Sequence, residues 1–446
     1  MAAAEQVPAA AAAAEPSTLD LEAYLTNYSG VTRIKRLAFI ASVSPAHKVD
    51  ALRIAVNEVK RTTNTSLFLE LTNLADDTGV VPHDALWVEQ VDRKAQQKLD
   101  KLEADLNHHK SCLVKEAIRM GHNDLGDFHY ERGEFNTALR CYVRTRDYCT
   151  TSKHIISMCL NVIRASIQMS NFTHVANYIA KAESTPSPDS GPDPLLQSQL
   201  RIAAGLAHLE SKKYKLAARK FLEVTLENCA YPEIASMQDV ALYGGLCALA
   251  SFDRAELRKL IDSASFRGFL ELFPQVREAV NDFFHSRYAS CLSYLDKLKP
   301  DLLLDLHLHD HVEELYTDVR SKALIQYFSP FVTVNMRLMA TAFNVEVDAL
   351  EKELAQLIMK GQIPARIDSQ AKVLHARNTD QRTATFNAAI KMGDDYIRDT
   401  KALLLRINLL RADFIVKGSG DVTGLGPSSK SSRQEARRGV ADTPMY

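Results

Sequence analysis

The sequence predicts a mainly α-helical protein: helical-hairpin repeats, then a small domain of helices and one strand pair, then one long C-terminal helix. Three observations support this prediction. Residues 83–185 contain no proline, and their apolar residues recur every three or four positions, as in amphipathic helices. A set of small and aromatic residues repeats at fixed offsets. Strand-like alternation is almost absent before residue 360 and then appears in two short segments.

The composition is typical of a globular protein without a strong charge preference. Of 446 residues, 46% are hydrophobic and 24% are charged, and 54 Lys and Arg balance 55 Asp and Glu. This balance gives no general attraction to nucleic acid or to an anionic membrane. No apolar run approaches the roughly 20 residues that span a bilayer. The seven cysteines form no CxxC pair, which favours a cytosolic or nuclear protein with neither disulfides nor a thiolate zinc cluster.

The N-terminal residues 1–18 are rich in alanine, carry no basic region and are interrupted by Glu and Pro. They do not match a signal peptide, so we expect a disordered leader. A helical region is predicted for 19–107. Its three- and four-residue spacing is carried near the end by Val91, Ala95, Leu99, Leu102 and Leu106.

Residues 108–298 contain an internal repeat. Two copies share offsets of 9, 12 and 16 residues from a glycine: Gly126, Phe135, Ala138 and Tyr142, and Gly205, Tyr214, Ala217 and Phe221. A degenerate copy between them has Phe172, Val175 and Ile179. In tetratricopeptide-like repeats, small residues let two antiparallel helices approach, and aromatic residues fill the space to the next pair. Because all the offsets coincide, we favour a right-handed array of such repeats over a chance similarity of amphipathic helices.

Residues 299–378 show the pattern of a winged helix, which is three helices and a hairpin. The first helix ends before Pro330, the short second helix follows Asn335 as its N-cap, and the third has an apolar face from Val347 to Ile358. Two alternating strands follow, with a turn at Asp368-Ser369: Ile363, Ala365 and Ile367, and Ala371, Val373 and His375. We predict that the hairpin edge binds a partner, through Ile363, Ala365, Ile367, Val373 and His375.

A single helix is predicted for 379–416, followed by a low-complexity tail at 417–446 that we expect to be disordered. Its apolar seam follows a spacing of four and three residues: Phe386, Ile390, Gly393, Ile397, Thr400, Leu404 and Ile407. Such a narrow seam is typical of helices that pack against partner helices. The predicted partner contacts are Phe386, Ile390, Ile397, Leu404 and Ile407.

The segment "DLHLHDHVEEL" at 305–315 raises the question of a metal site. On a helix, His309 would point away from His307 and His311. On a strand the outer two would lie about 13 Å apart, too far for one ion. We therefore favour a helix start, in which Asp310, Glu313 and Glu314 complement the helix dipole in the first turn. A metalloenzyme remains the less favoured alternative.

The remaining signatures of catalysis and nucleic-acid binding are weak. The chain has no GxxxxGK[ST], GxSxG, HExxH or strand-borne GxGxxG motif, so we predict no enzyme, no catalytic residue, no cofactor and no metal ligand. The third winged-helix segment has four acidic residues against two lysines, a surface that repels phosphate. The hairpin has Arg366, Lys372 and Arg377 but no interleaved aromatics. The basic stretches 33–36 and 211–215 are interpreted as solvated faces.

Several long runs resemble a known family. Helical repeats that feed directly into a winged helix define the PCI module of the proteasome lid, the signalosome and initiation factor three. Five long runs carry a closer similarity: "GHNDLGDF", "RTRDYCTTSKHI", "KKYKLAARKFLEV", "YGGLCALASFDRAEL" and "LLLDLHLHDHVEELYTDVRSKALIQYFSPF". They resemble the subunit-1 family of the COP-nine (constitutive photomorphogenesis) signalosome in its plant form, and the similarity extends from Leu19 to Val416.

The resemblance implies a non-catalytic scaffold subunit, found in nucleus and cytoplasm, whose partners are other PCI and MPN subunits. The signalosome removes a ubiquitin-like modifier from cullins, and so controls cullin-RING ubiquitin ligases and plant photomorphogenesis. Its zinc site belongs to an MPN subunit with the pattern H-S-H-P, seven residues, S-x-x-D. Aligned on His307 and His309, this chain departs from it at Asp310, Asp318 and Ser321. The alternatives are a scaffold subunit of the proteasome lid or initiation factor three, or a winged-helix nucleic-acid binder.

Overall fold

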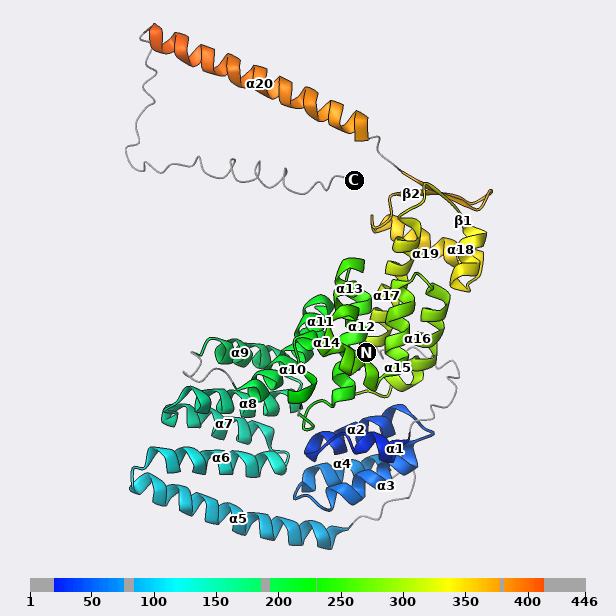
Figure 1. The fold of residues 1–446 in the computed structure, drawn as a ribbon. Helices are drawn as coiled ribbons and strands as arrows, with labels where there is room; N and C mark the ends of the chain where they lie inside the picture. The colour runs from blue at the N-terminus through cyan, green and yellow to red at the C-terminus, as the bar shows by residue number, and fades with distance from the viewer. Residues whose placement is uncertain (1–19, 76–83, 186–192, 230, 378–380, 413–446) are drawn as a thin grey trace, which may run out of the picture. The chain divides into compact units, whose positions relative to one another are not determined.

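We describe the protein from a computed structural model, in which residues 20–75, 84–185, 193–229, 231–377 and 381–412 are described (Figure 1). They form two units, Met1–Ala376 and Arg377–Tyr446. Almost all regular structure in them is helical, as predicted. None of their helices is long and apolar enough to cross a membrane.

The first four helices form an N-terminal bundle with a core of its own (blue in Figure 1). They are α1 (Leu21–Leu25), α2 (Gly30–Val43), α3 (Lys48–Val59) and α4 (Thr65–Ala75). Fully buried aliphatic and aromatic side chains from the last three meet inside it, among them Leu37, Ile40, Leu52, Phe68 and Leu71. The next helix, α5 (Ala85–Ser111), runs across the predicted boundary at 107 and buries only Ala95 and Leu106.

Helical hairpins follow, stacked on one another, as Figure 1 shows from cyan to green. Their helices are α6 (Lys115–Glu131), α7 (Phe135–Arg144), α8 (Ser152–Gln168), α9 (Phe172–Glu183), α10 (Pro194–Glu210), α11 (Tyr214–Leu222), α12 (Met237–Ser251), α13 (Arg254–Asp262), α14 (Ala264–Leu272), α15 (Pro274–Phe284) and α16 (Tyr288–Leu302). Two short 3₁₀ helices, Thr145–Tyr148 and Leu226–Asn228, lie between them.

The repeated glycines act as predicted. A Cβ added to Gly126 would lie 2.5 Å from the ring of Tyr142, and one added to Gly205 would lie 2.5 Å from the ring of Phe221. Real Cβ atoms do not approach a ring so closely, so each hairpin closes only because the first helix has no side chain there. The small-and-aromatic pattern therefore marks the close approach of two helices.

The hairpin turns share a further feature. The residue two positions before the second helix has a left-handed backbone in five helix pairs of the described chain, counting α5 with α6: Leu113, Gly133, Ser170, Lys212 and Ser286, with φ between +56° and +82°. The last of these reveals a copy of the repeat at α15 and α16 that the sequence analysis missed. Its residues, all buried, keep the offsets of 9, 12 and 16: Ala279, Tyr288, Cys291 and Leu295.

The winged helix consists of α17 (Val312–Phe328), β1 (Thr333–Asn335), α18 (Met336–Phe343), α19 (Val347–Met359), β2 (Ala365–Asp368) and β3 (Val373–Ala376). The three helices confirm the predicted pattern, and the Asn335 side chain caps α18 by accepting a 2.9 Å hydrogen bond from the Arg337 N–H. The sheet has a third strand that was not predicted, β1. The order is β1–β3–β2, with both pairs antiparallel.

The predicted second strand of the hairpin is wrong at its start. Asp368 Oδ1 accepts hydrogen bonds of 3.1 Å from the N–H groups of Gln370 and Ala371, so the turn extends beyond Asp368-Ser369. The strand then begins at Val373. The fully buried residue is Leu374, which lies opposite Ile367, whereas His375 faces solvent. The longer turn thus shifts which residues face the core.

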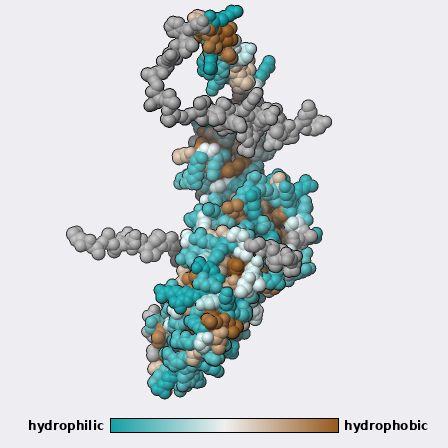
Figure 2. Space-filling model, turned by 90° about the vertical axis from the view of Figure 1, so that its left-hand side faces the viewer, coloured by the Kyte–Doolittle hydropathy of each residue, from teal (hydrophilic) through white to brown (hydrophobic). Residues whose placement is uncertain are grey.

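The second unit contains one described helix, α20 (Gln381–Arg411). It is 31 residues long, and none of its described side chains is buried. Figure 2 shows apolar residues gathered at the end of α20 that faces the viewer, at the top of the picture. The last three turns there carry Leu403, Leu404, Leu405, Ile407, Leu409 and Leu410.

Candidate partner interfaces and a buried charge cluster

The histidine segment lies in the turns between α16 and α17, and its histidines have separate partners. His309 Nδ1 lies 2.8 Å from the carbonyl oxygen of Leu303, and His311 Nδ1 lies 3.4 Å from the hydroxyl of Tyr214. His307 is buried. No group of three or more His, Cys, Asp or Glu side chains in the described part of the chain could hold a metal ion.

The predicted helix start at this segment is confirmed, with α17 beginning at Val312. Glu313 and Glu314 lie in its first turn, where carboxylates complement the helix dipole. Asp310, expected beside them, lies before the helix. The histidine segment therefore connects the repeats to the winged helix.

The interpretation of residues 33–36 as a solvated face is wrong for Arg36. Its side chain is fully buried, with Nη1 2.7 Å from Asp305 Oδ2 and Nη2 3.0 Å from Asp239 Oδ2. These ion pairs join α2 of the N-terminal bundle, α12 of the repeats and the segment before α17. Lys35 is also partly buried and donates a 2.6 Å hydrogen bond to the Gln168 carbonyl.

Tyrosine hydroxyls add hydrogen bonds to this cluster of Arg36, Asp239 and Asp305. Tyr28 donates to Asp239 Oδ1 and Tyr243 donates to Asp305 Oδ1, both at 2.7 Å. Arg36 Nη1 also donates to the Tyr24 hydroxyl at 2.6 Å. A buried charge is tolerated only when it is paired and hydrogen-bonded. Two carboxylates pair with Arg36, and its Nη1 and Nη2 are hydrogen-bonded, whereas its buried Nε has no hydrogen-bond partner among the described residues.

The two carboxylates of the cluster share one cation, and this sets their protonation. Burial raises the pKa of Asp239, although Arg36 opposes it. Burial acts in the same direction on Asp305, but there the Arg36 guanidinium and neighbouring hydrogen bonds outweigh it and the pKa is lowered. Burial and the charge of Arg36 lower the pKa of His307 to about 4, so this imidazole is neutral near pH 7 and supplies no second positive charge.

The sequence analysis missed this cluster because its members come from distant segments. Arg36 lies 203 residues from Asp239 and 269 residues from Asp305. One local signal existed: Ser236 and Asp239 form a capping box at the start of α12. It identifies Asp239 as a cap but gives no sign of Arg36.

The predicted partner residues of the hairpin lie in three different environments. Ile363 and Ala365 are buried, and Ile367 is partly buried against the core. Val373 and His375 lie on β3, which is paired on both sides, so they are not at an edge. The open edges of the sheet are those of β1 and β2. Binding of a partner at one of these edges stays a prediction. Such a partner would form hydrogen bonds with the backbone of β1 or β2 rather than contacts with these five side chains.

Exposed apolar side chains lie elsewhere on the winged helix and were not singled out from the sequence. They flank β1 and lie on α18 and at the end of α19: Phe331, Val332, Leu338 and Met359. The basic hairpin residue Lys372 is engaged, with Nζ 2.9 Å from Asp348 and 2.8 Å from Glu351. Asp348 and Glu351 lie on α19, the helix that a nucleic-acid binder would present to phosphate, and they neutralise the charge of Lys372. This pairing disfavours the nucleic-acid-binding alternative.

The predicted residues of α20 form an exposed stripe. Phe386, Ile390, Ile397, Leu404 and Ile407 have exposed fractions between 46% and 64%. Their spacing of four and three residues places them on one side of the helix. Binding of partner helices to this stripe stays a prediction.

A helical-repeat array that continues through α17 into a winged helix defines the class of PCI subunits. Sequence comparison agrees, since the PCI domain family matches residues 294–378 and the family described as 26S proteasome subunit RPN7 matches residues 84–260. A third family, described as COP9 signalosome complex subunit 1, C-terminal helix, matches residues 381–406. The chain belongs to the COP9 signalosome subunit 1 family.

Whole-chain relatives support this assignment. COP9 signalosome complex subunit 1 of Arabidopsis thaliana is 54% identical over 406 residues, which cover 89% of this chain and 91% of that protein. Subunit 1b of Drosophila melanogaster is 42% identical, covering 90% and 87%. The 26S proteasome non-ATPase regulatory subunit 6 of Oryza sativa is only 24% identical, covering 74% and 85%. The proteasome alternative thus reflects a more distant relationship.

Proposed function

We propose that this chain is a non-catalytic scaffold subunit of a COP9 signalosome, bound to other PCI and MPN subunits. The observation that carries the proposal is α20, a 31-residue helix whose apolar stripe has no partner among the described residues of the chain. In proteins most of the stability of a helix comes from packing of its apolar face, and such a stripe favours association with other helices. Helices of neighbouring subunits provide that contact.

The complex acts on cullin-RING ubiquitin ligases. In this proposal it removes a ubiquitin-like modifier from cullins, in nucleus and cytoplasm, and in plants it thereby regulates light-dependent development. The catalytic zinc site lies in an MPN subunit. This chain positions the other subunits and takes no part in the reaction. The buried Arg36 cluster supports a positioning role, because it fixes the N-terminal bundle against the repeats and the entry to the winged helix.

Assembly tests the proposal directly. Deleting Gln381–Arg411 should release the chain from the complex reconstituted with its partner subunits, while the thermal unfolding of the Met1–Ala376 unit stays unchanged. A sharper variant is Ile390→Glu with Leu404→Glu, which places two charges on the stripe. The matched control is Ala388→Glu with Ala402→Glu, which adds the same charges on the opposite side of the helix.

The measurement is co-elution of the subunits in size-exclusion chromatography, with the composition read by mass spectrometry. The stripe variant should be lost from the complex and the control retained. Equal retention of both variants would contradict a helical-bundle role for α20. Co-elution with proteasome-lid subunits instead would contradict the signalosome assignment.

A further inference from the structure

One edge of the repeat array gathers positive charge. There α5 and α7 end and α6 and α8 begin, as the left edge of Figure 1 shows. Four exposed cations lie at these helix ends: Lys110, Lys115, Arg144 and Lys153. We call this set the basic edge, and it belongs entirely to the Met1–Ala376 unit.

Contacts between the helices bring the four ends together. Burial, and after it the positive charges of Lys110 and Arg144, lower the pKa of His122 on α6, so the end of α5 lies close to the end of α7. His154 Nδ1 at the start of α8 lies 3.9 Å from Glu116 Oε2 at the start of α6. The four cations therefore share one region of the surface.

The carboxylates at these helix ends are already paired with other cations. Glu116 Oε1 lies 2.5 Å from Arg119 Nη2, and Asp147 Oδ1 lies 3.3 Å from Arg146 Nε. Among the described residues, no carboxylate forms an ion pair with any cation of the basic edge. The basic edge thus keeps its charge after the local ion pairs have formed.

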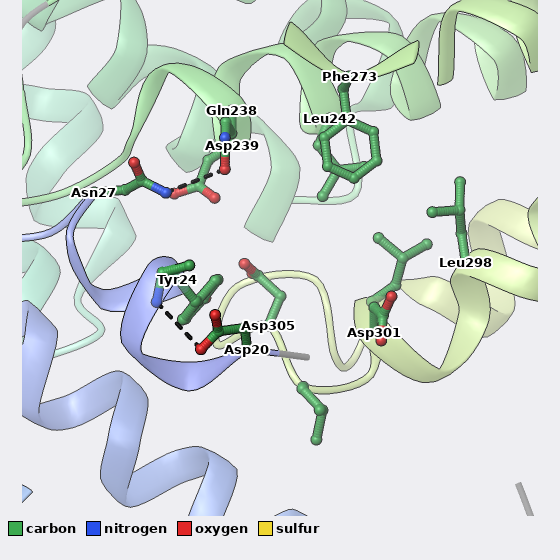
Figure 3. Close-up of a pocket in the computed structure, with 13 residues that line it drawn as sticks. Asp20, Tyr24, Asn27, Gln238, Asp239, Leu242, Phe273, Leu298, Asp301 and Asp305 are labelled. Atoms are coloured by element: carbon green, nitrogen blue, oxygen red, sulfur yellow. Dashed lines mark hydrogen bonds between the residues drawn. The ribbon is translucent and has the colours of Figure 1, made fainter. Parts of the chain in front are cut away.

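The carboxylates of the pocket in Figure 3 show the opposite case. Asp239 and Asp305 line this pocket, and both pair with Arg36 of the same chain. Their charge is compensated without a partner. The cations of the basic edge have no such compensation within the described chain, so they can attract a partner of opposite charge.

Exposed apolar side chains lie in the turn between α5 and α6, beside the basic edge. Leu113 is 81% exposed, and Val114 is also exposed. Leu113 has a φ of +56°, a left-handed backbone that is unfavourable for a bulky residue. The other four helix pairs have glycine, serine or lysine at this position. A leucine that is strained and directed into water points to a contact outside the chain.

The combination of cations and apolar side chains distinguishes between classes of partner. Single-stranded nucleic acid is bound by cations together with aromatic residues that stack on its bases. The exposed aromatic residues of the described chain, Phe331, Phe386 and Tyr396, lie elsewhere. A membrane surface is bound by one amphipathic helix with cations along its polar face, whereas these cations come from the ends of four helices. A protein segment with both carboxylates and an apolar residue fits both features.

We propose that the basic edge, together with Leu113 and Val114, binds an acidic segment of a partner protein that carries an apolar residue among its carboxylates. The terminal segments of this chain do not match. Residues 1–19 have two Glu that are ten positions apart, and residues 413–446 have five Lys and Arg against four Asp and Glu. The proposal goes beyond assembly through α20, because it uses no residue of that helix and its test needs no other subunit.

The probe is a fluorescein-labelled peptide of about twelve residues, with Asp and Glu on both sides of a central Leu-Phe pair. Fluorescence anisotropy with the purified full chain should show saturable binding with a Kd on the order of 0.1 mM at low salt. A peptide with Asn and Gln in place of the acidic residues should bind at least about tenfold more weakly. Raising the ionic strength from about 0.05 M to about 0.3 M should weaken binding of the acidic peptide about fivefold.

Charge reversal tests the basic edge directly. Lys110→Glu with Arg144→Glu should weaken binding of the acidic peptide at least about tenfold. The matched control is Lys94→Glu with Arg277→Glu, which makes the same change in net charge at exposed residues of α5 and α15. The control should leave binding within about twofold. All four positions are exposed, so both variants should fold, which a thermal melt verifies.

Leu113→Gly separates binding from folding. Glycine adopts a positive φ without strain, so the melting temperature should stay the same or rise. Binding of the acidic peptide should nevertheless weaken about threefold, because the apolar contact is lost. A leucine that served only folding would lower the melting temperature when it is removed and leave binding unchanged.

Several outcomes would overturn the proposal. They are equal binding of the acidic and neutral peptides, equal behaviour of the two double variants, unchanged binding by Leu113→Gly, or no saturable binding up to about 1 mM. Tighter binding of a uridine oligonucleotide than of the acidic peptide would assign the basic edge to nucleic acid instead. Tighter binding of phosphatidylserine vesicles would assign it to a membrane surface.

Discussion

Two helices of this protein, α12 and α20, carry many apolar residues and have opposite surroundings. In α12, eleven consecutive residues from Asp239 to Leu249 are buried, so apolar side chains point in every direction. In α20, the residues of the stripe lie on one side of the helix, further leucines lie around its last three turns, and no described side chain is buried. A helix that is apolar on all sides is buried within its own protein. A helix with an apolar stripe packs through that one face against another surface.

The difference shows which apolar surfaces are covered by the chain itself and which are not. The environment of α12 comes from α11, α14, α15 and α17 of the same unit, and its buried charge Asp239 has Arg36 as a partner. The apolar stripe of α20 has no such environment in the described residues. Substitutions should therefore act on the stability of the free chain around α12, and on assembly around α20.

The largest expected effect is at Arg36. Arg36→Met leaves two buried carboxylates without a cation, and breaking a buried pair in this way costs about 3–5 kcal/mol. The measurement is the free energy of unfolding in urea. Arg33→Met is the control, because Arg33 is partly exposed and its ion pair with Glu58 at 3.6 Å is worth about 1 kcal/mol or less.

A double variant tests the physical reason for this effect. Asp239→Leu in the Arg36→Met background removes one of the unpaired charges and should recover part of the lost stability. If Arg36→Met destabilised the protein no more than Arg33→Met, the cluster would not fasten α2 to α12, and the contrast with α20 would lose its main support.

The Arg36 cluster also shows where prediction from sequence reaches its limit. The hairpin offsets, the Asn335 cap and the α20 stripe follow from residues within one or two helical turns, or from a period that the sequence displays. Arg36 looks like any basic residue on an amphipathic helix until its partners, more than 200 residues away, are placed beside it. Long-range pairing leaves no local pattern.

Only part of the winged-helix sheet was predicted from the sequence, for a related reason. The strand β1 has three residues and no alternation to detect, because its hydrogen-bond partner β3 follows it by about forty positions. The turn before β3 was placed too early, and a shift of one residue exchanges the two faces of a strand. Val373 and His375, which were predicted at the hairpin edge, lie on the central strand β3, and their role in binding a partner stays a prediction.

The second prediction concerns pH. His307 has a pKa of about 4 in the folded protein, against about 6.5 when exposed in the unfolded chain. The unfolded state therefore binds its proton first, and stability falls as pH decreases from about 6.5 to 4, by roughly 3 kcal/mol at most. Asp239, whose pKa is raised, offsets part of this loss. Melting temperatures between pH 7 and 4 check it.

His307→Gln should flatten this dependence, because the glutamine side chain does not titrate. His285→Gln is the matched control, since His285 lies exposed at the end of α15. An unchanged pH profile in the His307 variant would show that other groups produce the acid sensitivity of the Met1–Ala376 unit.

The third prediction uses the close approach of α10 and α11. Gly205→Ala places a methyl group 2.5 Å from the ring of Phe221, and forcing extra volume into a packed interior costs about 1–3 kcal/mol. The unfolding free energy should fall by that amount. Gly205→Ala combined with Phe221→Leu should recover stability if the clash with the ring is the cause, and the absence of recovery would point to another contact.

The smallest effect should have the opposite sign. Gly393 lies on α20, and nothing lies within 4 Å of a Cβ added there. Gly393→Ala therefore meets no clash and gains the helix propensity that separates alanine from glycine, about 1 kcal/mol. Amide hydrogen exchange of α20 in the full chain should slow up to about fivefold, while the unfolding of the Met1–Ala376 unit stays the same. Faster exchange, or a lower melting temperature of that unit, would mean that α20 packs against the chain after all, and the contrast with α12 would fail.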